Sequence, residues 1–212
     1  MTMRPVYYTF SPDDEDTDGF ANNVTAASGA AFTLITDETP DGLAHKVVIT
    51  PSGAVTGNYT ITGKDANGVE TTETLATDAA NAVTSARFYA SDIVVTAPSG
   101  LGAETVDIGW ADEFASQTIP LEIYLRNGAL VGCQVTLSGT ANFDIEDTMS
   151  DIRGDPNSPP EQADLTWLND ANFTAKSASL SAQLAVLARA IRLVINSYSS
   201  GAVLTLAIVT PR

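Results

Sequence analysis

The stretch TGNYTITGKDANGVETTETLA, residues 56–76, contains two strand-like segments around a tight turn. Tyr59 and Ile61 alternate with polar residues, and this two-residue period is typical of a strand with one buried face. Between the segments lie residues that tolerate the positive φ angles of a chain reversal, namely Asp65, Asn67 and Gly68. The stretch therefore predicts a β-hairpin.

Short strand-like runs continue on both sides of this hairpin, among them AAFTLIT, HKVVIT, DIVVTAP and ETVDIGWA. Clusters of Gly, Pro, Asn or Asp separate them, which is typical of sandwiches and barrels. The Thr- and Glu-rich strand 69–75 is expected to stay solvated or to meet a specific partner. We predict an all-β fold with two β-sandwich-like domains.

Three segments are expected along the chain, an N-terminal arm and two domains. The stretch WADEFASQT, residues 110–118, is expected to link the two domains. The polar and acidic residues 1–28 are expected to form an extended N-terminal arm. The first domain is placed at residues 29–112 and the second at residues 113–212.

The second domain is expected to contain a hairpin at Asn127–Gly128, the strand ANFDIEDT and a proline-rich surface loop, residues 153–162. Residues 178–187 fit either a short helix, because leucines recur at helical spacing, or another strand, which we prefer. The run RAIRLVINSY and the segment SSGAVLTLAIVT predict a closing hairpin from about residue 189 to 209.

Acidic residues dominate the charge, with 26 Asp and Glu against 10 Lys and Arg, a formal net charge of −16. Phosphate backbones and anionic membranes repel such a surface, so we expect neither nucleic acid nor membrane as a partner. A large net charge also keeps a protein soluble at high local concentration.

A single cysteine, Cys133, rules out a disulfide within the chain, and its alternation in a predicted strand indicates a small core residue. The N-terminal residues lack the pattern of a signal peptide, and no apolar run approaches the length of a membrane helix. Synthesis in a cytoplasm is the expectation that follows.

Several of these stretches together resemble structural proteins of tailed bacteriophages. The hairpin reads I-T-G-x-D-x-x-G and is followed by VTSARFYASDIVVTAP and ETVDIGWAD, while ANFDIEDT, DLTWLND and ARAIRLVINSYSSGAVLTLAIV resemble the C-terminal portion of small phage virion proteins. These are strand and turn patterns, not catalytic signatures, and they cover about two thirds of the chain. The resemblance implies a virion component built from β-sandwich modules.

An acidic stretch near the N-terminus, SPDDEDTDGF, contains the first half of an EF-hand loop, with Asp14, Asp16, Asp18 and Gly19 in place. Thr25 stands where the bidentate glutamate of that loop is required. The expectation is therefore a solvated acidic turn, or an arm that docks on a basic patch of a neighbouring subunit, and no metal or cofactor is predicted.

Residues in patterns typical of catalytic sites are sparse. His45 is the only histidine and is expected to be an ordinary strand residue, and no G-x-S-x-G motif accompanies it. Glycoside hydrolysis needs two carboxyl groups across a cleft, and no pattern in the sequence places two of the acids there. The acids that would be considered are Asp107, Asp112, Glu113, Asp144, Glu146 and Asp147. We predict that the protein is not an enzyme.

Interface candidates are few. Trp110 and Trp167 are either core anchors or interface residues, and Arg189 and Arg192 pair either with a neighbour's acidic turn or with acids of the same chain. The residues assigned to an interface are Asp14, Asp16, Asp18, Trp167, Arg189 and Arg192.

The leading prediction is a bacteriophage capsid decoration protein that bridges capsid subunits, with the major capsid protein or other virion proteins as partners and a trimer as the preferred homo-oligomer. A tail or neck adaptor is the second prediction, and a carbohydrate-binding module or depolymerase at the host surface is the third. The expected location is the virion, assembled in the host cytoplasm.

Overall fold

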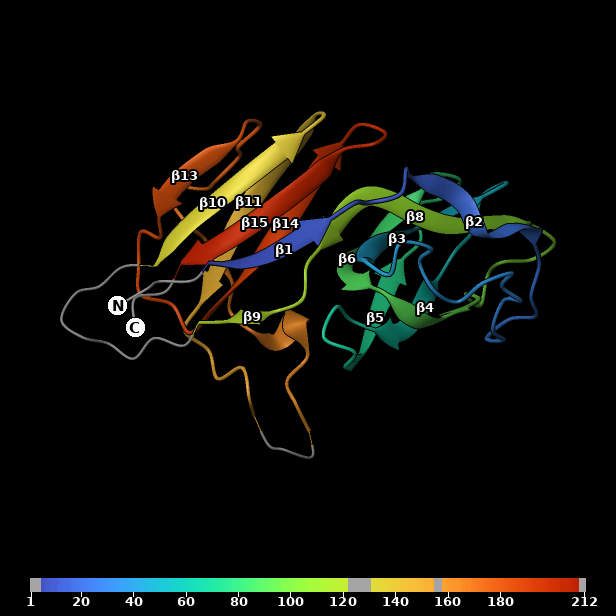
Figure 1. Cartoon of the computed structure of the whole chain (residues 1–212). Helices are drawn as coiled ribbons and strands as arrows, with labels where there is room; N and C mark the ends of the chain where they lie inside the picture. The colour runs from blue at the N-terminus through green and yellow to red at the C-terminus, as the bar shows by residue number, and fades with distance from the viewer. Residues whose placement is uncertain (1–4, 122–130, 155–157, 210–212) are drawn as a thin grey trace. The chain divides into compact units, whose positions relative to one another are not determined.

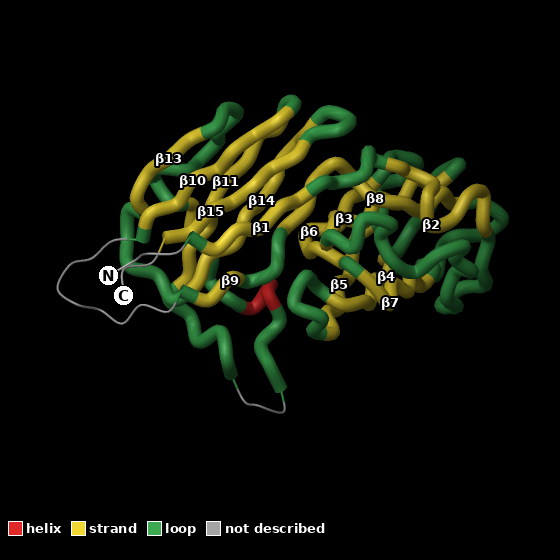
Figure 2. The backbone as a smooth tube through the Cα atoms, viewed as in Figure 1, coloured by secondary structure: helices red, strands yellow, loops and turns green. Residues whose placement is uncertain are grey.

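The computed structural model describes residues 5–121, 131–154 and 158–209, and within these ranges the regular structure is antiparallel β-strand apart from one short 3-10 helix, Gln162–Asp164 (Figures 1 and 2). The predicted all-β class is confirmed. In the described ranges no helix is long and apolar enough to cross a membrane.

Two compact units make up the chain, Glu15–Phe114 and Met1–Asp14 with Ala115–Arg212. We call them the middle unit and the terminal unit. The division after residue 114 lies inside strand β8, Val106–Ala115, so the expected linker 110–118 is mostly strand.

The N-terminal residues are strands instead of an extended arm. Strand β1, Val6–Phe10, pairs with β15, Val203–Val209, in the terminal unit. Strand β2, Asp16–Val24, pairs with β8 in the middle unit. In β1, Tyr8 and Phe10 face the core opposite Leu206 and Leu204, and their alternation with Tyr7 and Thr9 is the sequence signal of this strand.

The middle unit has two groups of paired strands. Strand β8 lies between β2 and β3, Ala44–Pro51, and β3 pairs with β6, Val83–Tyr89. The other group has the order β5-β4-β7, which are Glu70–Ala76, Asn58–Lys64 and Ser91–Thr96. Its core is one cluster of apolar side chains that includes Phe20, Tyr59, Ile61, Ile93 and Trp110.

The hairpin predicted at 56–76 is confirmed, because β4 and β5 pair from Asn58 opposite Ala76 to Lys64 opposite Glu70. In the turn, Oδ1 of Asp65 accepts the backbone N–H groups of Asn67 at 2.8 Å and of Val69 at 3.0 Å. Gly68 has a φ of +75°, the conformation that the sequence predicted for this position.

The terminal unit contains two sheets. The first has the order β1-β15-β10-β13, where β10 is Gly132–Ser138 and β13 is Leu180–Gln183. In the second, β14, Ala190–Tyr198, pairs with β11, Ala141–Thr148, and with β9, Ile119–Pro120. Strand β12, Leu168–Asn169, extends the second sheet beside β11.

The predicted closing hairpin from 189 to 209 is wrong, because β14 and β15 lie in different sheets (Figure 1). The turn at Ser199–Gly201 carries the chain from one sheet to the other, and Gly139 and Thr140 do the same between β10 and β11. The N–H of Ser199 donates to the carbonyl of Thr140 at 2.8 Å, which ties the two connections together. Separating the strands lets their apolar faces cover the core from both sheets.

The open question at residues 178–187 is answered in favour of a strand, since Leu180–Gln183 forms β13 and pairs with β10. ANFDIEDT forms β11 as expected. The hairpin predicted at Asn127–Gly128 lies outside the described residues.

Candidate functional site

The acidic stretch near the N-terminus is part of strand β2 in the middle unit from Asp16 onward, so the expectation of an acidic turn is corrected. Oδ1 of Asp16 accepts the N–H of Asp18 at 3.2 Å, and the amide of Asn22 donates to Asp18. The bond from Asn22, followed by the interaction with Asp16, lowers the pKa of Asp18. Among the described residues no three acids, histidines or cysteines gather into a metal-binding group.

Trp110 is a core residue, which decides between the two readings left open by the sequence. Its side chain is buried, and its ring centroid lies 5.1 Å from that of Phe20. Strand β2 approaches it closely, because a Cβ added at Gly19 would lie 2.2 Å from Cζ3 of Trp110.

Trp167 and Arg192 come together in the terminal unit. The guanidinium carbon of Arg192 lies 4.5 Å from the ring centroid of Trp167, and its Nε donates to Oε2 of Glu146 at 2.6 Å. The indole N–H of Trp167 donates to the backbone carbonyl of Gln162 at 2.8 Å. A guanidinium held by a carboxylate and an aromatic ring has a fixed orientation.

Gln162 is the centre of this group and was missed by the sequence analysis. Its side chain is buried, and its Oε1 accepts a hydrogen bond from Arg192 at 3.0 Å. Its Nε2 donates to the carbonyl of Ser116 at 3.0 Å. Gln162 therefore fastens the end of the proline-rich loop to the second sheet, and nothing in the sequence pattern marked it.

Arg189 behaves differently from Arg192. It pairs with Asp151 at 3.3 Å, and both side chains are more than half exposed. Exposed pairs of this kind contribute little to stability. The structure thus places Arg192 in a structural cluster of its own chain and leaves Arg189 accessible from solvent.

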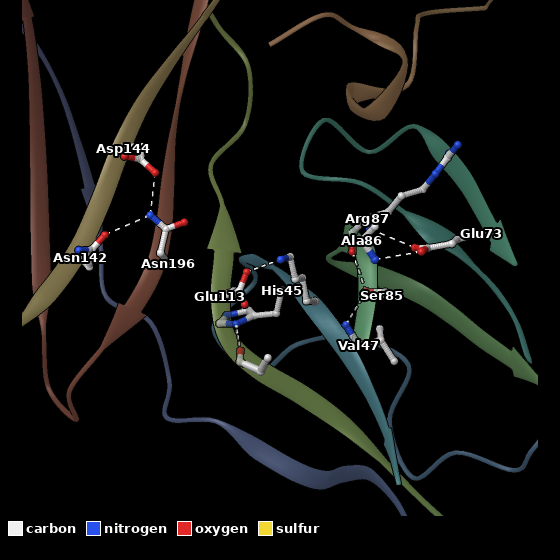
Figure 3. Close-up of polar contacts among 12 residues, drawn as sticks. His45, Val47, Glu73, Ser85, Ala86, Arg87, Glu113, Asn142, Asp144 and Asn196 are labelled. Carbon is white, nitrogen blue, oxygen red and sulfur yellow. Dashed lines mark hydrogen bonds and ion pairs between the residues drawn. The ribbon is translucent and has the colours of Figure 1, made fainter. Parts of the chain in front are cut away.

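His45 is buried in the middle unit, with both ring nitrogens next to oxygen acceptors. Figure 3 draws the contact of one of the two nitrogens. Nε2 lies 2.8 Å from Oδ2 of Asp41, and Nδ1 lies 3.0 Å from the carbonyl of Ala111. The ring of Phe114 is 5.6 Å away, centroid to centroid. These contacts join the start of β3 to β8 and agree with the expectation of an ordinary strand residue.

The acids considered for glycoside hydrolysis are divided between the two units. Asp107 accepts the N–H of Asn23 at 2.7 Å, Glu113 pairs with Lys46, and Glu146 pairs with Arg192. Oδ2 of Asp144 accepts from the amide of Asn196 at 2.7 Å (Figure 3). Each of these four acids holds strands or loops of its own unit together.

Three carboxyl groups are buried in the described part of the terminal unit, those of Asp144, Asp147 and Asp170. Burial raises the pKa of Asp147, and the neighbouring charges of Asp170 and Glu146 raise it further. Asp170 accepts the N–H groups of Asn172 at 2.8 Å and Ala185 at 2.6 Å, which shapes the loop before β14. Asp147 continues the alternation of Phe143 and Ile145, a signal that the sequence contained.

Cys133 is buried as predicted, and its burial, together with the charge of Asp170, raises the pKa of the thiol to about 12. A thiol of this kind is largely protonated at neutral pH and is therefore a weak nucleophile.

No protein-family model matches the sequence, and no curated protein matches it. A search of solved structures returns the major capsid protein P2 of bacteriophage PM2, with 10% sequence identity over 98% of this chain and 99% of that chain. The TM-score is 0.24, so this comparison carries no argument about fold or function.

Proposed function

We propose that the protein is a structural component of a bacteriophage virion, and that it is an accessory protein on the outside of the head. Its role would be binding without chemistry, in which it bridges neighbouring capsid subunits and adds buried area across their junctions. The partners are the major capsid protein or other virion proteins, together with further copies of this chain in a closed oligomer, for which a trimer is preferred.

The observation that carries the proposal is that polar side chains of the described residues bond strands and loops to one another. Glu73 on β5 accepts the backbone N–H groups of Ala86 at 2.9 Å and Arg87 at 3.0 Å on β6 (Figure 3). The side chain of Arg87 in turn donates to Thr71 at 2.6 Å. Like the pairs at Arg192 and His45, these bonds hold strands and loops of one unit together, which fits a role in binding without chemistry.

The charge and the sequence patterns support the same proposal. A net charge of −16 favours a position away from packaged DNA, because like charges repel across a shared surface. The hairpin at 56–76, whose pattern resembles virion proteins, is a well-formed β4–β5 pair in the structure. Its β5 strand lies at the edge of its sheet with Thr72 and Thr74 exposed.

A particle-stability assay tests the proposal. Phage particles that lack the protein are heated with and without the purified chain, and release of DNA is followed with a dye. A decoration protein raises the release temperature and binds in a fixed ratio to the head protein. If the chain does not bind heads but binds tails or necks, the adaptor function replaces decoration, and binding to host-surface sugars alone would support the third function.

A further inference from the structure

Among the described residues, the four strands of the first sheet of the terminal unit present no charged side chain on their outward side. Strands β1, β15, β10 and β13 contain no Asp, Glu, Lys, Arg or His, whereas every other strand of four residues or more in the described ranges has at least one. We call the outward residues of these four strands the uncharged face. They are Tyr7, Thr9, Gly132, Gln134, Thr136, Ser138, Ser181, Gln183, Val203, Thr205, Ala207 and Val209.

The strand register arranges these residues in rows across the sheet. One row runs from Tyr7 through Ala207 and Gln134 to Ser181. The small residues Gly132 and Ala207 leave a shallow depression, which Tyr7 borders on the β1 side. The next row begins with Thr9 and Thr205, whose hydroxyl oxygens lie 3.3 Å apart.

Much of the face is open to solvent, although Ala207 is buried and the other outward residues of β15 are half-buried. The side chain of Tyr7 is 65% exposed, and most of the outward residues of β10 and β13 are exposed as well. The structural cause is alternation, since the intervening residues Val135, Leu204 and Leu206 are buried in the core.

We propose that the uncharged face is a contact surface for the same face of a second copy of this chain. Two copies each carry a net charge of −16, so most approaches between them bring like charges together. A face without charges keeps carboxylates of the two copies out of direct contact, and repulsion between charges farther away is screened by salt, with a screening length of about 8 Å at physiological salt. A basic partner, in contrast, would gain more from contact with the acidic surfaces elsewhere.

The side chains on the face also suit a partner with the same groups. The hydroxyls of Thr, Ser and Tyr and the amide of Gln each donate and accept hydrogen bonds, so any two of these groups can pair when residues of one copy meet different residues of the other across a two-fold axis. Charged groups of one sign lack this property, because two carboxylates offer acceptors only.

The size of the face sets the strength of the contact. The patch is four strands wide, at about 4.8 Å per strand, and roughly seven residues long, at about 3.3 Å per residue. Its area is therefore about 400 Å² per copy. Stable complexes bury about 1,200–2,000 Å² in total, so this contact gives a weak, reversible pair. It uses one face of one unit, and it does not depend on the proposed virion role or on the predicted trimer.

Sedimentation velocity over a micromolar to millimolar concentration series tests the proposal. The wild-type chain is expected to form a reversible dimer, and added salt should strengthen it because salt screens the residual repulsion. The double variant Gln134→Glu, Thr136→Glu should weaken the dimer at least about tenfold, since it places like charges opposite each other. The control variant Thr72→Glu, Thr74→Glu adds the same charge to exposed positions of β5 and should change the dissociation constant by less than about twofold.

Disulfide trapping gives a second readout that does not depend on added charge. Thr136→Cys should form covalent dimers on oxidation, and Thr74→Cys should not, while the buried Cys133 reacts little in either protein. Circular dichroism confirms that each variant is folded. A wild-type chain that stays monomeric throughout the series overturns the proposal, and so does a dimer that the glutamates at 134 and 136 leave unchanged.

Discussion

Gly19 on β2 lies against the ring of Trp110 on β8, so closely that an added Cβ would lie 2.2 Å from Cζ3 and 2.5 Å from Cη2 of the indole. The same pair of strands is close at Gly109, where an added Cβ would lie 1.8 Å from the backbone oxygen of Asp16. Two glycines therefore allow β2, which carries the acidic stretch, to pack directly on β8.

Gly19→Ala tests this close packing. The added methyl group has to displace Trp110 or move β2, and overpacking of this kind costs about 1–3 kcal/mol of unfolding free energy. The control is Thr17→Ala at an exposed position of the same strand. Denaturant unfolding followed by tryptophan fluorescence measures both, and equal stabilities for the two variants would contradict the packing.

Tyr59→Phe should stabilise the middle unit. The hydroxyl of Tyr59 is buried and has no hydrogen-bond partner among the described residues, and burial raises the pKa of the phenol. A buried unsatisfied hydroxyl costs about 1–3 kcal/mol, so its removal should raise the melting temperature of this unit.

The matched control is Tyr198→Phe in the terminal unit, where the hydroxyl donates to the backbone carbonyl of Asp13. This change should lower the stability by about 1 kcal/mol. Thermal melting followed by near-ultraviolet circular dichroism compares the two variants. A lower melting temperature of Tyr59→Phe would contradict the prediction, because it would show that the hydroxyl of Tyr59 stabilises the fold.

Asp147 should make the terminal unit less stable as pH rises. Its pKa is raised in the folded protein, so the folded chain binds its proton more tightly than the unfolded chain does. The stabilisation is complete below the unfolded pKa of about 3.9 and is lost as pH increases through the raised folded pKa. Asp147→Asn removes this dependence.

Urea unfolding between acidic and neutral pH measures the effect. The unfolding free energy of the wild-type protein should decrease from acidic to neutral pH, and the decrease should be smaller in Asp147→Asn. Asp151→Asn, at an exposed position, should show the same decrease as the wild type. Identical profiles for wild type and Asp147→Asn would show that the raised pKa of Asp147 does not contribute.

Arg192→Lys should destabilise the terminal unit by about 1–3 kcal/mol, because lysine cannot bond Glu146 and Gln162 together while stacking on Trp167. Arg189→Lys should change stability by less than about 0.5 kcal/mol, since that pair is exposed. Unfolding monitored by circular dichroism separates the two. A larger effect at Arg189 than at Arg192 would contradict the structural assignment of the cluster.

Local patterns allowed much of the fold to be predicted from the sequence. The β4–β5 hairpin followed from alternation around Tyr59 and from the turn at Gly68, both of which act over a few residues. The placement of β14 and β15 in different sheets did not follow, because a Ser–Ser–Gly turn serves a hairpin and a crossing between sheets equally well. Which strand becomes the partner depends on residues far away in the sequence.

The contact between Trp167 and Arg192 was not predicted from the sequence. Trp167 and Arg192 were both singled out, but their contact depends on Gln162, a buried polar residue in a loop without periodicity. The uncharged face could not be recognised from the sequence, because its rows join residues from β1 to β15 at opposite ends of the chain. Only the register shows that these neutral strands share one sheet.

The proposed place of this chain in a virion is tested most directly by immunogold labelling of purified phage particles with antibody to the protein. The decoration role predicts gold spread over the head, together with peptides of the chain in mass spectra of the same particles. Label confined to the tail or neck would contradict decoration and support an adaptor. Absence of both label and peptides from the particles would contradict the virion assignment itself.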